Sequence, residues 1–268
     1  MPTLGLDPGE FGKQIEDAGF RSVWFSSVNN VSALEPIEAV LSATSRLIVG
    51  TGIASIWTWD PAELGARADG IALSYPGRFI LGLGNSHAPI VESMGQSYTR
   101  PYSKMVQFLD ALQETAPLVL AALGPKMLKL SGDRALGAHP YFIPPEHTKF
   151  AREVLGPQPL LIPEIAVALA PGDQGEAHAR AYAKFYLQLP NYTSNLKRLG
   201  FTDEDIADGG SARLITAVTP HGPEDSVTRI RQHLEAGADH VVVQILGEKG
   251  RFAAGDLGAL AGLVAGLR

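Results

Sequence analysis

The sequence contains no cysteine. This absence excludes disulfide bonds, thiolate metal ligands and a cysteine nucleophile. Positive charge is also scarce, because 22 Lys and Arg residues face 28 Asp and Glu residues and give a net charge of -6. No basic stretch is present that could neutralise the phosphates of a nucleic acid, so we expect no nucleic-acid partner.

Long hydrophobic runs are missing as well. The most apolar segment, "LGALAGLVAGL" at 257–267, is shorter than the about 20 residues that a transmembrane helix needs. The opening "MPTLGLDPGEFGK" lacks the basic start and the apolar run of a secretory signal. We therefore expect a cytoplasmic protein without a membrane partner.

Several motifs of common enzyme classes are absent. The chain has no Walker loop, no G-x-S-x-G elbow and no H-E-x-x-H motif, and its seven histidines show no metal-ligand spacing. The stretch "GLGNSH" carries His87 where a dinucleotide-binding fingerprint needs its third glycine. No linker rich in Pro, Ser or Gly divides the chain. These absences predict one domain over 1–268 and no metal site.

What the sequence does contain is an alternation of apolar strands and helical stretches. Several predicted strands are apolar on both faces, which is typical of a parallel sheet covered by helices. The strand candidates are 22–25, 47–54, 79–84, 118–123, 138–142, 160–170 and 240–246, with 2–6 as a weaker eighth.

Helix boundaries recur in the same form along the chain. Asp7-Pro8 and Asp60-Pro61 both predict a capping Asp followed by Pro at the first helical position. Eight strands counted generously, each with a helix, predict an α/β fold of the (β/α)₈ barrel type, with a doubly wound open sheet as the alternative. Residues 176–218 are predicted to form a helical insertion before the last strand.

Small and polar residues follow the predicted strands, and this pattern predicts a pocket. Active sites of barrels form at the C-terminal ends of the strands, and a glycine near a strand end leaves room for a ligand. The candidates are Ser26, Gly52, Asn85, His87 and His139. His87 could instead be an ordinary turn residue, and His139 a hydrogen-bonded histidine of the core.

The stretch "LAALGPKMLKL" at 120–130 predicts an anion-binding loop. Gly124 permits a tight turn after the strand, and Pro125 takes the first position of a new helix. The backbone N–H groups of such a helix start can bind a phosphate, and Lys126 can add charge. The alternative is that Gly-Pro only starts a helix.

Five stretches in the same order resemble the bacterial luciferase-like monooxygenase family, which includes oxidoreductases that use the deazaflavin coenzyme F420. The stretches are "EDAGFRSVWF", "ATSRLIVGTGIASIW", "YPGRFILGLGNSHAPIVESMG", "LAALGPKMLKLSGDRALGAHPYF" and "GPEDSVTRIRQHLEAGADHVVVQI". The resemblance implies a (β/α)₈ barrel with a late insertion, coenzyme F420 (or FMN) at its C-terminal mouth, a small-molecule substrate and a homodimer.

The resemblance also implies roles for single residues. It places a cis non-prolyl peptide at Gly52-Ile53, under the cofactor ring, and assigns proton transfer to His87. The implied cofactor-binding residues are Ser26, Gly52, Ile53, Asn85, Ala122, Leu123, Gly124, Pro125, Lys126, Met127 and His139.

Two departures from the family pattern keep three functions open. Only "MPTLGL" stands where a longer strand 1 and loop are usual, and "FSSVNN" stands where an acid or a histidine is frequent. The leading hypothesis is hydride transfer between coenzyme F420 and an organic substrate. The second is an FMN-dependent monooxygenase supplied with reduced flavin by a reductase. The third is a non-catalytic barrel that binds only a ligand or a partner.

Overall fold

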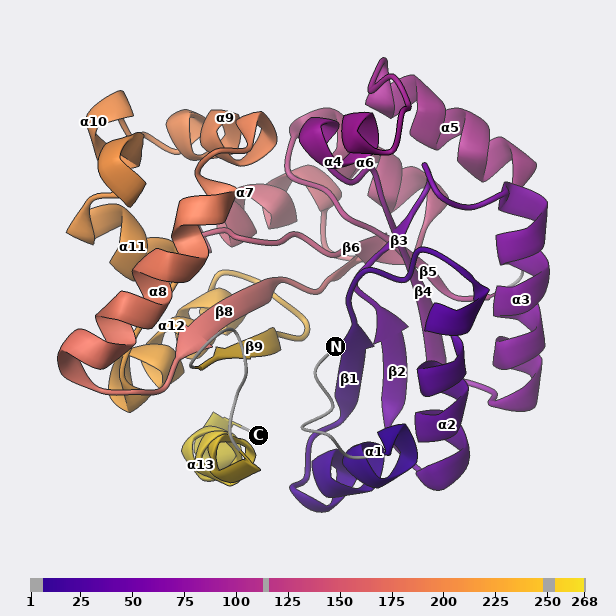
Figure 1. The fold of residues 1–268 in the computed structure, drawn as a ribbon, viewed down its shortest axis with the longest axis horizontal. Helices are drawn as coiled ribbons and strands as arrows, with labels where there is room; N and C mark the ends of the chain where they lie inside the picture. The colour runs from indigo at the N-terminus through magenta and orange to yellow at the C-terminus, as the bar shows by residue number, and fades with distance from the viewer. Residues whose placement is uncertain (1–6, 113–115, 248–253, 268) are drawn as a thin grey trace. The chain divides into compact units, whose positions relative to one another are not determined.

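The computed structural model describes residues 7–112, 116–247 and 254–267, and Figure 1 labels their helices and strands. Packing divides the chain into two compact units. Of the described residues, unit 1 comprises those within 7–122 and 129–139, and unit 2 comprises those within 123–128 and 140–267. Each unit is described by itself.

Unit 1 alternates helices with parallel strands. Its strands are β1 (Ser22–Phe25), β2 (Ile48–Thr51), β3 (Ala54–Ser55), β4 (Phe79–Gly84), β5 (Leu118–Leu120) and β6 (Gly137–Ala138). Its helices are α1 (Pro8–Asp17), η1 (Val31–Ala33), α2 (Glu35–Ala43), α3 (Pro61–Ser74), α4 (Ala88–Ser93) and α5 (Pro101–Ala111). Helix α6 (Pro125–Arg134) begins in unit 2 and ends in unit 1.

The strands of unit 1 lie in the order β1-β2-β4-β5-β6, with β3 beside β4 (Figure 1). Every pair is parallel, and Phe25 at the end of β1 lies opposite Thr51 at the end of β2. The C-terminal ends of the strands therefore meet along one edge of the sheet, which brings the loops after them together.

The predicted helix starts are confirmed. The Asp7 carboxylate accepts the backbone N–H of Gly9 at 2.9 Å, and the Asp60 carboxylate accepts that of Ala62 at 3.0 Å. In both helices Pro follows the capping Asp, where its missing N–H costs no helical hydrogen bond. These caps set where α1 and α3 begin, and thereby the direction in which the chain returns to the next strand.

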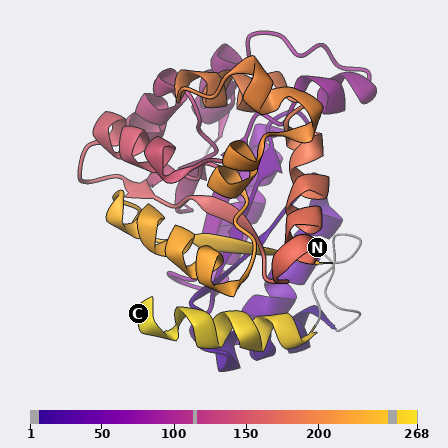
Figure 2. The ribbon, with the colours of Figure 1, turned by 90° about the vertical axis from the view of Figure 1, so that its left-hand side faces the viewer.

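Unit 2 combines a two-stranded parallel sheet with many helices. Strand β8 (Glu164–Ala168) pairs with β9 (Val242–Leu246). The other elements are α7 (Pro145–Leu155), β7 (Leu160–Leu161), α8 (Gly172–Tyr186), α9 (Pro190–Arg198), α10 (Asp203–Ile206), η2 (Ala207–Gly209), α11 (Ala212–Val218), α12 (Pro223–Glu235), α13 (Ala254–Val264) and η4 (Ala265–Leu267). Figure 2 turns the helices that follow β8 toward the viewer. Helices occupy most of the segment 176–218, and its role as an insertion in a barrel stays a prediction.

Strand β8 packs against two helices of unit 2, α8 and α12. Ala166 and Ala168 form a small apolar cluster with Leu246 of β9, against which Tyr182 of α8 packs. Helix α12 also contacts β8. Because side chains alternate along a strand, the small alanines of one face leave room for the tyrosine ring.

Several predicted strand boundaries are wrong. The predicted strand 160–170 is interrupted at Pro163, whose missing N–H cannot take part in a ladder. The strand predicted at 138–142 is Gly137–Ala138, the one at 118–123 ends at Leu120, and the last one begins at Val242. The candidate 2–6 lies outside the described residues.

The fold class is confirmed at the level of a mixed α/β fold with parallel sheets. Closure into a (β/α)₈ barrel, and the single domain over 1–268, stay predictions. Among the residues that the structure describes, no helix is long and apolar enough to cross a membrane.

Candidate functional site

The loop after β2 contains the predicted cis peptide. The bond between Gly52 and Ile53 is cis, which confirms the prediction. The backbone around it is tied to β1, because Gly52 N–H donates to Phe25 O at 2.8 Å and Val28 N–H donates to Ile53 O at 3.2 Å. The loops after β1 and β2 therefore form one joined surface at the strand ends of unit 1.

Thr51 links β2 to β4 through its side chain. The Thr51 hydroxyl donates to Gly82 O at 2.8 Å and accepts Gly82 N–H at 2.7 Å. The residue is fully buried. At this point the backbone of β2 turns toward the cis peptide, and the Thr51 hydroxyl takes the place of a backbone hydrogen-bond partner on β2. The N–H and the carbonyl of Gly82 therefore both stay hydrogen-bonded.

The glycines at the strand ends accommodate side chains of the protein itself. A Cβ atom on Gly50 would lie 2.5 Å from the Trp24 ring, and one on Gly84 would lie 2.7 Å from the Ile53 side chain. At these two positions the glycines make room for side chains of the protein, and the ligand contact predicted at Gly52 stays a prediction. Trp24 and Ile53 fill that room.

Asn85 and His87 follow β4 at the same edge. Both are half-buried. The Asn85 side-chain oxygen is buried and has no hydrogen-bond partner in the described part of the chain. His87 is the residue before α4, and its carbonyl accepts the N–H groups of Ile90 and Val91, each at 3.0 Å. Proton transfer by His87 stays a prediction.

His139 lies against Trp24 at the end of β6. The two rings are stacked with centroids 4.5 Å apart and planes 17° apart. His139 is 2% exposed, and its N–H continues the ladder by donating to Leu120 O at 2.8 Å. This packing favours the interpretation of His139 as a core histidine over its interpretation as a cofactor-binding residue. A cofactor contact of His139 stays a prediction.

Two further predicted cofactor-binding residues differ in exposure. Ser26 is exposed after β1, and Ala122 is buried.

The predicted anion loop lies in unit 2 and has the predicted form. Helix α6 begins at Pro125, and Leu128 N–H donates to Gly124 O at 3.0 Å. The N–H groups of a first helical turn point out of the N-terminus, where the helix dipole is positive. We call Leu123, Gly124, Pro125, Lys126 and Met127 the helix-start loop.

Arg198 of α9 adds a positive charge to the helix-start loop. Its Nη1 atom lies 3.3 Å from the position that a Cβ atom would take on Gly124. Asn195, one turn earlier and 1% exposed, accepts Arg198 Nη2–H at 2.9 Å and so orients the guanidinium. Arg198 is exposed and makes no ion pair with a described carboxylate. The sequence analysis missed Arg198, and no motif marks it.

A buried histidine supports the same loop. His147 of α7 is fully buried, and its Nε2–H donates to Leu123 O at 2.9 Å. Burial is the main cause that lowers the pKa of His147 to about 4, and the nearby positive charge of Arg198 lowers it further. His147 is therefore neutral at pH 7 and acts as a hydrogen-bond donor rather than as a charge.

Unit 2 also contains a tyrosine cluster that the sequence analysis missed. The Tyr141 hydroxyl hydrogen-bonds to that of Tyr182, lies 3.1 Å from that of Tyr186 and donates to Gln244 Oε1 at 2.6 Å. Burial raises the pKa of Tyr182 and of Tyr186, so both stay protonated at neutral pH. Phe185, beside Tyr186 on α8, is 49% exposed.

The part of the chain that the structure describes holds no group of three or more metal-ligating side chains. The candidate site residues of the described chain fall into three groups. The first is the strand-end residues of unit 1, the second is the helix-start loop with Arg198 in unit 2, and the third is the tyrosine cluster of unit 2. The first offers a half-buried histidine, and the second offers backbone N–H groups and a cation for an anion.

Comparisons with known proteins find similar chains and similar structures. The chain is 24% identical over 291 aligned positions to the 5,10-methylenetetrahydromethanopterin reductase of Methanolobus tindarius. The alignment covers 97% of this chain and 79% of the reductase. The structure of this chain resembles an F420-dependent secondary alcohol dehydrogenase in complex with an F420-acetone adduct, with a TM-score of 0.73, 16% identity and coverage of 98% and 96% of the two chains.

A third likeness is to a protein that binds a flavin. The oxygenating constituent of 3,6-diketocamphane monooxygenase from Pseudomonas putida, in complex with FMN, aligns with a TM-score of 0.70 and 14% identity over 96% of this chain and 90% of that one. At these identities the structural likenesses show the fold. Residues 8–116 match the family model described as luciferase-like monooxygenase. Over these residues the chain is similar to the luciferase-like monooxygenase family, and its likeness to the reductase runs along almost its whole length.

Proposed function

We propose that this protein is an oxidoreductase that transfers a hydride between the deazaflavin coenzyme F420 and an organic substrate. Its relatives include a reductase and an F420-dependent dehydrogenase. The observation that carries the proposal is the position of Arg198 beside Gly124, at the start of α6. A coenzyme with a phosphate-bearing tail needs an anion-binding site, and a cation beside a helix N-terminus can provide one.

The donor set at the helix-start loop fits an anion. Gly124 has no side chain, so an anion can approach the backbone N–H groups of the first turn closely. Arg198 offers guanidinium donors whose charge no described carboxylate neutralises, and such donors match the oxygens of a phosphate. Lys126 is exposed on the first turn. We assign the anionic tail of the cofactor to these residues.

His147 and Asn195 would keep this arrangement in place. His147 holds the carbonyl of Leu123 directly before Gly124, and Asn195 holds the Arg198 side chain. Because both supports are buried, the loop and the cation are oriented before a ligand arrives. A site oriented in advance loses less conformational entropy on binding.

The strand-end residues of unit 1 would serve the chemical step. When bound, the deazaflavin supplies the carbon centre that gives or takes the hydride. His87 is assigned the accompanying proton transfer, since an unperturbed imidazole titrates near neutral pH. Asn85 has a buried oxygen without a partner in the described chain, and it can accept a hydrogen bond from the ligand.

A monooxygenase that uses FMN is the second candidate. The likeness to the FMN complex of the 3,6-diketocamphane enzyme favours it, and the helix-start loop would suit the phosphate of FMN equally well. The third candidate is a barrel that binds no redox cofactor.

Titration of the purified protein with coenzyme F420 and with FMN, followed by fluorescence, tests the proposal. We expect tighter binding of F420, and about tenfold weaker binding for Arg198→Gln, which corresponds to about 1.4 kcal/mol. Lys197→Gln is the matched control, because Lys197 is a neighbouring cation of α9 that pairs with Asp203 at 2.5 Å. Tighter binding of FMN would favour the second candidate, and no binding of either cofactor would favour the third.

A further inference from the structure

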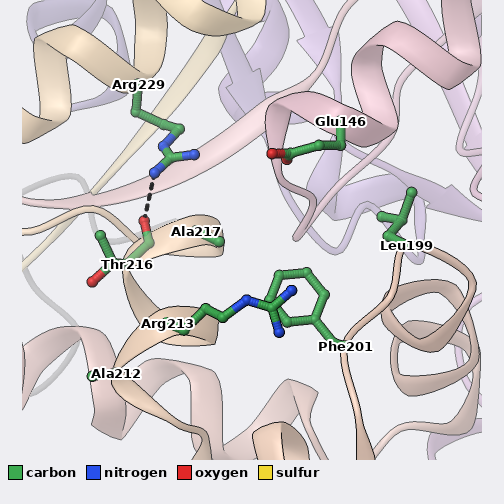
Figure 3. Close-up of a pocket in the computed structure, with 8 residues that line it drawn as sticks. All are labelled: Glu146, Leu199, Phe201, Ala212, Arg213, Thr216, Ala217 and Arg229. Atoms are coloured by element: carbon green, nitrogen blue, oxygen red, sulfur yellow. Dashed lines mark hydrogen bonds between the residues drawn. The ribbon is translucent and has the colours of Figure 1, made fainter.

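Unit 2 contains a cavity that the proposed function does not use. It has a volume of about 500 Å³ and lies among α7, α11, α12 and the segment after α9. Its walls include Glu146, Leu199, Phe201, Arg213, Thr216 and Arg229 (Figure 3). This volume is within the range of cavities that hold small-molecule ligands.

One of the two arginines in the cavity has its charge neutralised. The Arg213 guanidinium lies over the Phe201 ring, with its central carbon 4.6 Å from the ring centroid. The same side chain pairs with Asp205 at 2.5 Å. Arg213 therefore covers part of the Phe201 ring, and its charge is already paired with that of Asp205.

Arg229 has no such partner. Its Nη2–H donates to Thr216 O at 3.0 Å, which orients the side chain. Its Nε atom is buried and has no hydrogen-bond partner among the described residues. Burial is the main cause that lowers the pKa of Arg229, whereas the charges of Glu146 and Asp225 raise it. A partly buried cation with unused donors favours a carboxylate as its ligand.

Glu146 is the counterpart of Arg229 on the facing wall. Glu146 lies in the first turn of α7, where the helix dipole favours its negative charge. The two charges influence each other, yet they form no ion pair within 4.0 Å. Figure 3 shows the two side chains extending toward the same space from different helices. A group placed between them can contact both.

The carboxylates at and near the cavity disfavour a strongly anionic ligand. Arg213 pairs with Asp205, whereas the unpaired Arg229 lies in the field of Glu146 and of the exposed Asp225. A phosphate ester would be repelled by two carboxylates. A ligand with one positive and one negative group matches both walls.

We propose that this cavity binds a small zwitterion of the amino-acid type. Its carboxylate pairs with Arg229, its ammonium pairs with Glu146, and its apolar side chain packs on Leu199 and Phe201. In an α-amino acid the two charged groups are neighbours, so one molecule can bridge two facing side chains that do not reach each other. The site is separate in function from the helix-start loop.

Calorimetric titration with L-phenylalanine as the probe tests the proposal. Two analogues isolate the charges: 3-phenylpropanoate lacks the ammonium, and 2-phenylethylamine lacks the carboxylate. We expect binding of the amino acid, and binding at least about tenfold weaker for each analogue, since each leaves one charged wall unpaired. Equal binding of 3-phenylpropanoate would overturn the proposal, as would no binding of the amino acid at millimolar concentrations.

Variants locate the binding in this cavity. Arg229→Met and Glu146→Gln should each weaken binding of L-phenylalanine by about tenfold or more. Arg231→Met is the matched control, because Arg231 is an exposed arginine of the same helix. If loss of the bond to Thr216 prevents Arg229→Met from folding, Glu146→Gln still decides, because Glu146 is exposed. Unchanged binding in folded Glu146→Gln would overturn the proposal.

Discussion

The Nε2–H group of His147 donates a 2.9 Å hydrogen bond to the carbonyl of Leu123, the residue directly before Gly124. His147 is fully buried, and its pKa lies at about 4 because burial disfavours the imidazolium. A neutral imidazole in the interior thus holds the first residue of the helix-start loop.

This arrangement predicts a loss of stability in mild acid. In the unfolded chain His147 takes up a proton near pH 6.5, whereas in the folded protein it does so only near pH 4. The folded state is therefore fully stabilised above pH 6.5 and loses stability as the pH falls toward 4, by about 2 kcal/mol at pH 5. His233, whose pKa burial lowers to about 3, acts in the same direction.

His147→Gln separates this contribution from the others. The amide keeps a donor for Leu123 O but does not titrate. Urea denaturation at pH 7 and pH 5 should show that the variant loses about 2 kcal/mol less than the wild type between the two pH values. Parallel pH profiles for the two proteins would show that His147 titrates normally.

Gly124→Val should weaken cofactor binding more than it weakens folding. A Cβ atom at this position would lie 3.3 Å from Arg198 Nη1, so branched carbons would occupy the place assigned to the anion. We expect about tenfold weaker binding of the cofactor in fluorescence titration. Gly70→Val in α3, where an added Cβ atom would meet nothing within 4 Å, serves as the control. Unchanged affinity in the folded valine variant would mean that Gly-Pro only starts α6.

His87→Ala should slow turnover without changing cofactor affinity. A positioned acid or base typically contributes about 10²–10⁴-fold to the rate. Steady-state kinetics with a verified substrate should show this loss in kcat, and His87→Gln should not restore the rate because an amide cannot exchange the proton. Full turnover in the alanine variant would show that His87 has no role in proton transfer and is only the turn residue before α4.

Thr51→Val should destabilise unit 1 although it hardly changes the side-chain volume. The substitution removes the bonds to Gly82 N–H and Gly82 O and leaves two buried backbone groups unpaired. We expect a loss of about 2–4 kcal/mol in the free energy of unfolding. Thr51→Ser keeps the hydroxyl and should lose about 1 kcal/mol. A smaller loss for valine than for serine would contradict the role of the hydroxyl.

The elements that local sequence determines were predicted well. The strands 22–25 and 79–84 begin and end where the apolar runs do, and the cis peptide at Gly52-Ile53 followed from the family pattern. The two strands and the cis peptide each depend on residues that are neighbours in the chain. The strand predicted at 160–170 is too long, because Pro163 has no N–H to give to the ladder and separates β7 from β8.

The features that were missed depend on contacts between distant segments. Arg198 reaches Gly124 only because α9 passes beside the start of α6. The hydroxyl cluster joins Tyr141, Tyr182 and Gln244, which lie on three separate elements. Neither arrangement has a motif or a periodicity in the sequence, since no single element contains more than part of it.

The ring of Trp24 over Gly50 has a consequence for mutagenesis screens. Any side chain at position 50 would collide with the indole at about 2.5 Å, and the displaced indole would in turn disturb the imidazole of His139 on which it stacks. Variants at position 50 would therefore score as inactive in a random library although Gly50 contacts no reactant. Position 50 is therefore intolerant to substitution because the Trp24 ring packs directly on it. An activity screen without a measurement of folding would wrongly assign Gly50 a catalytic role.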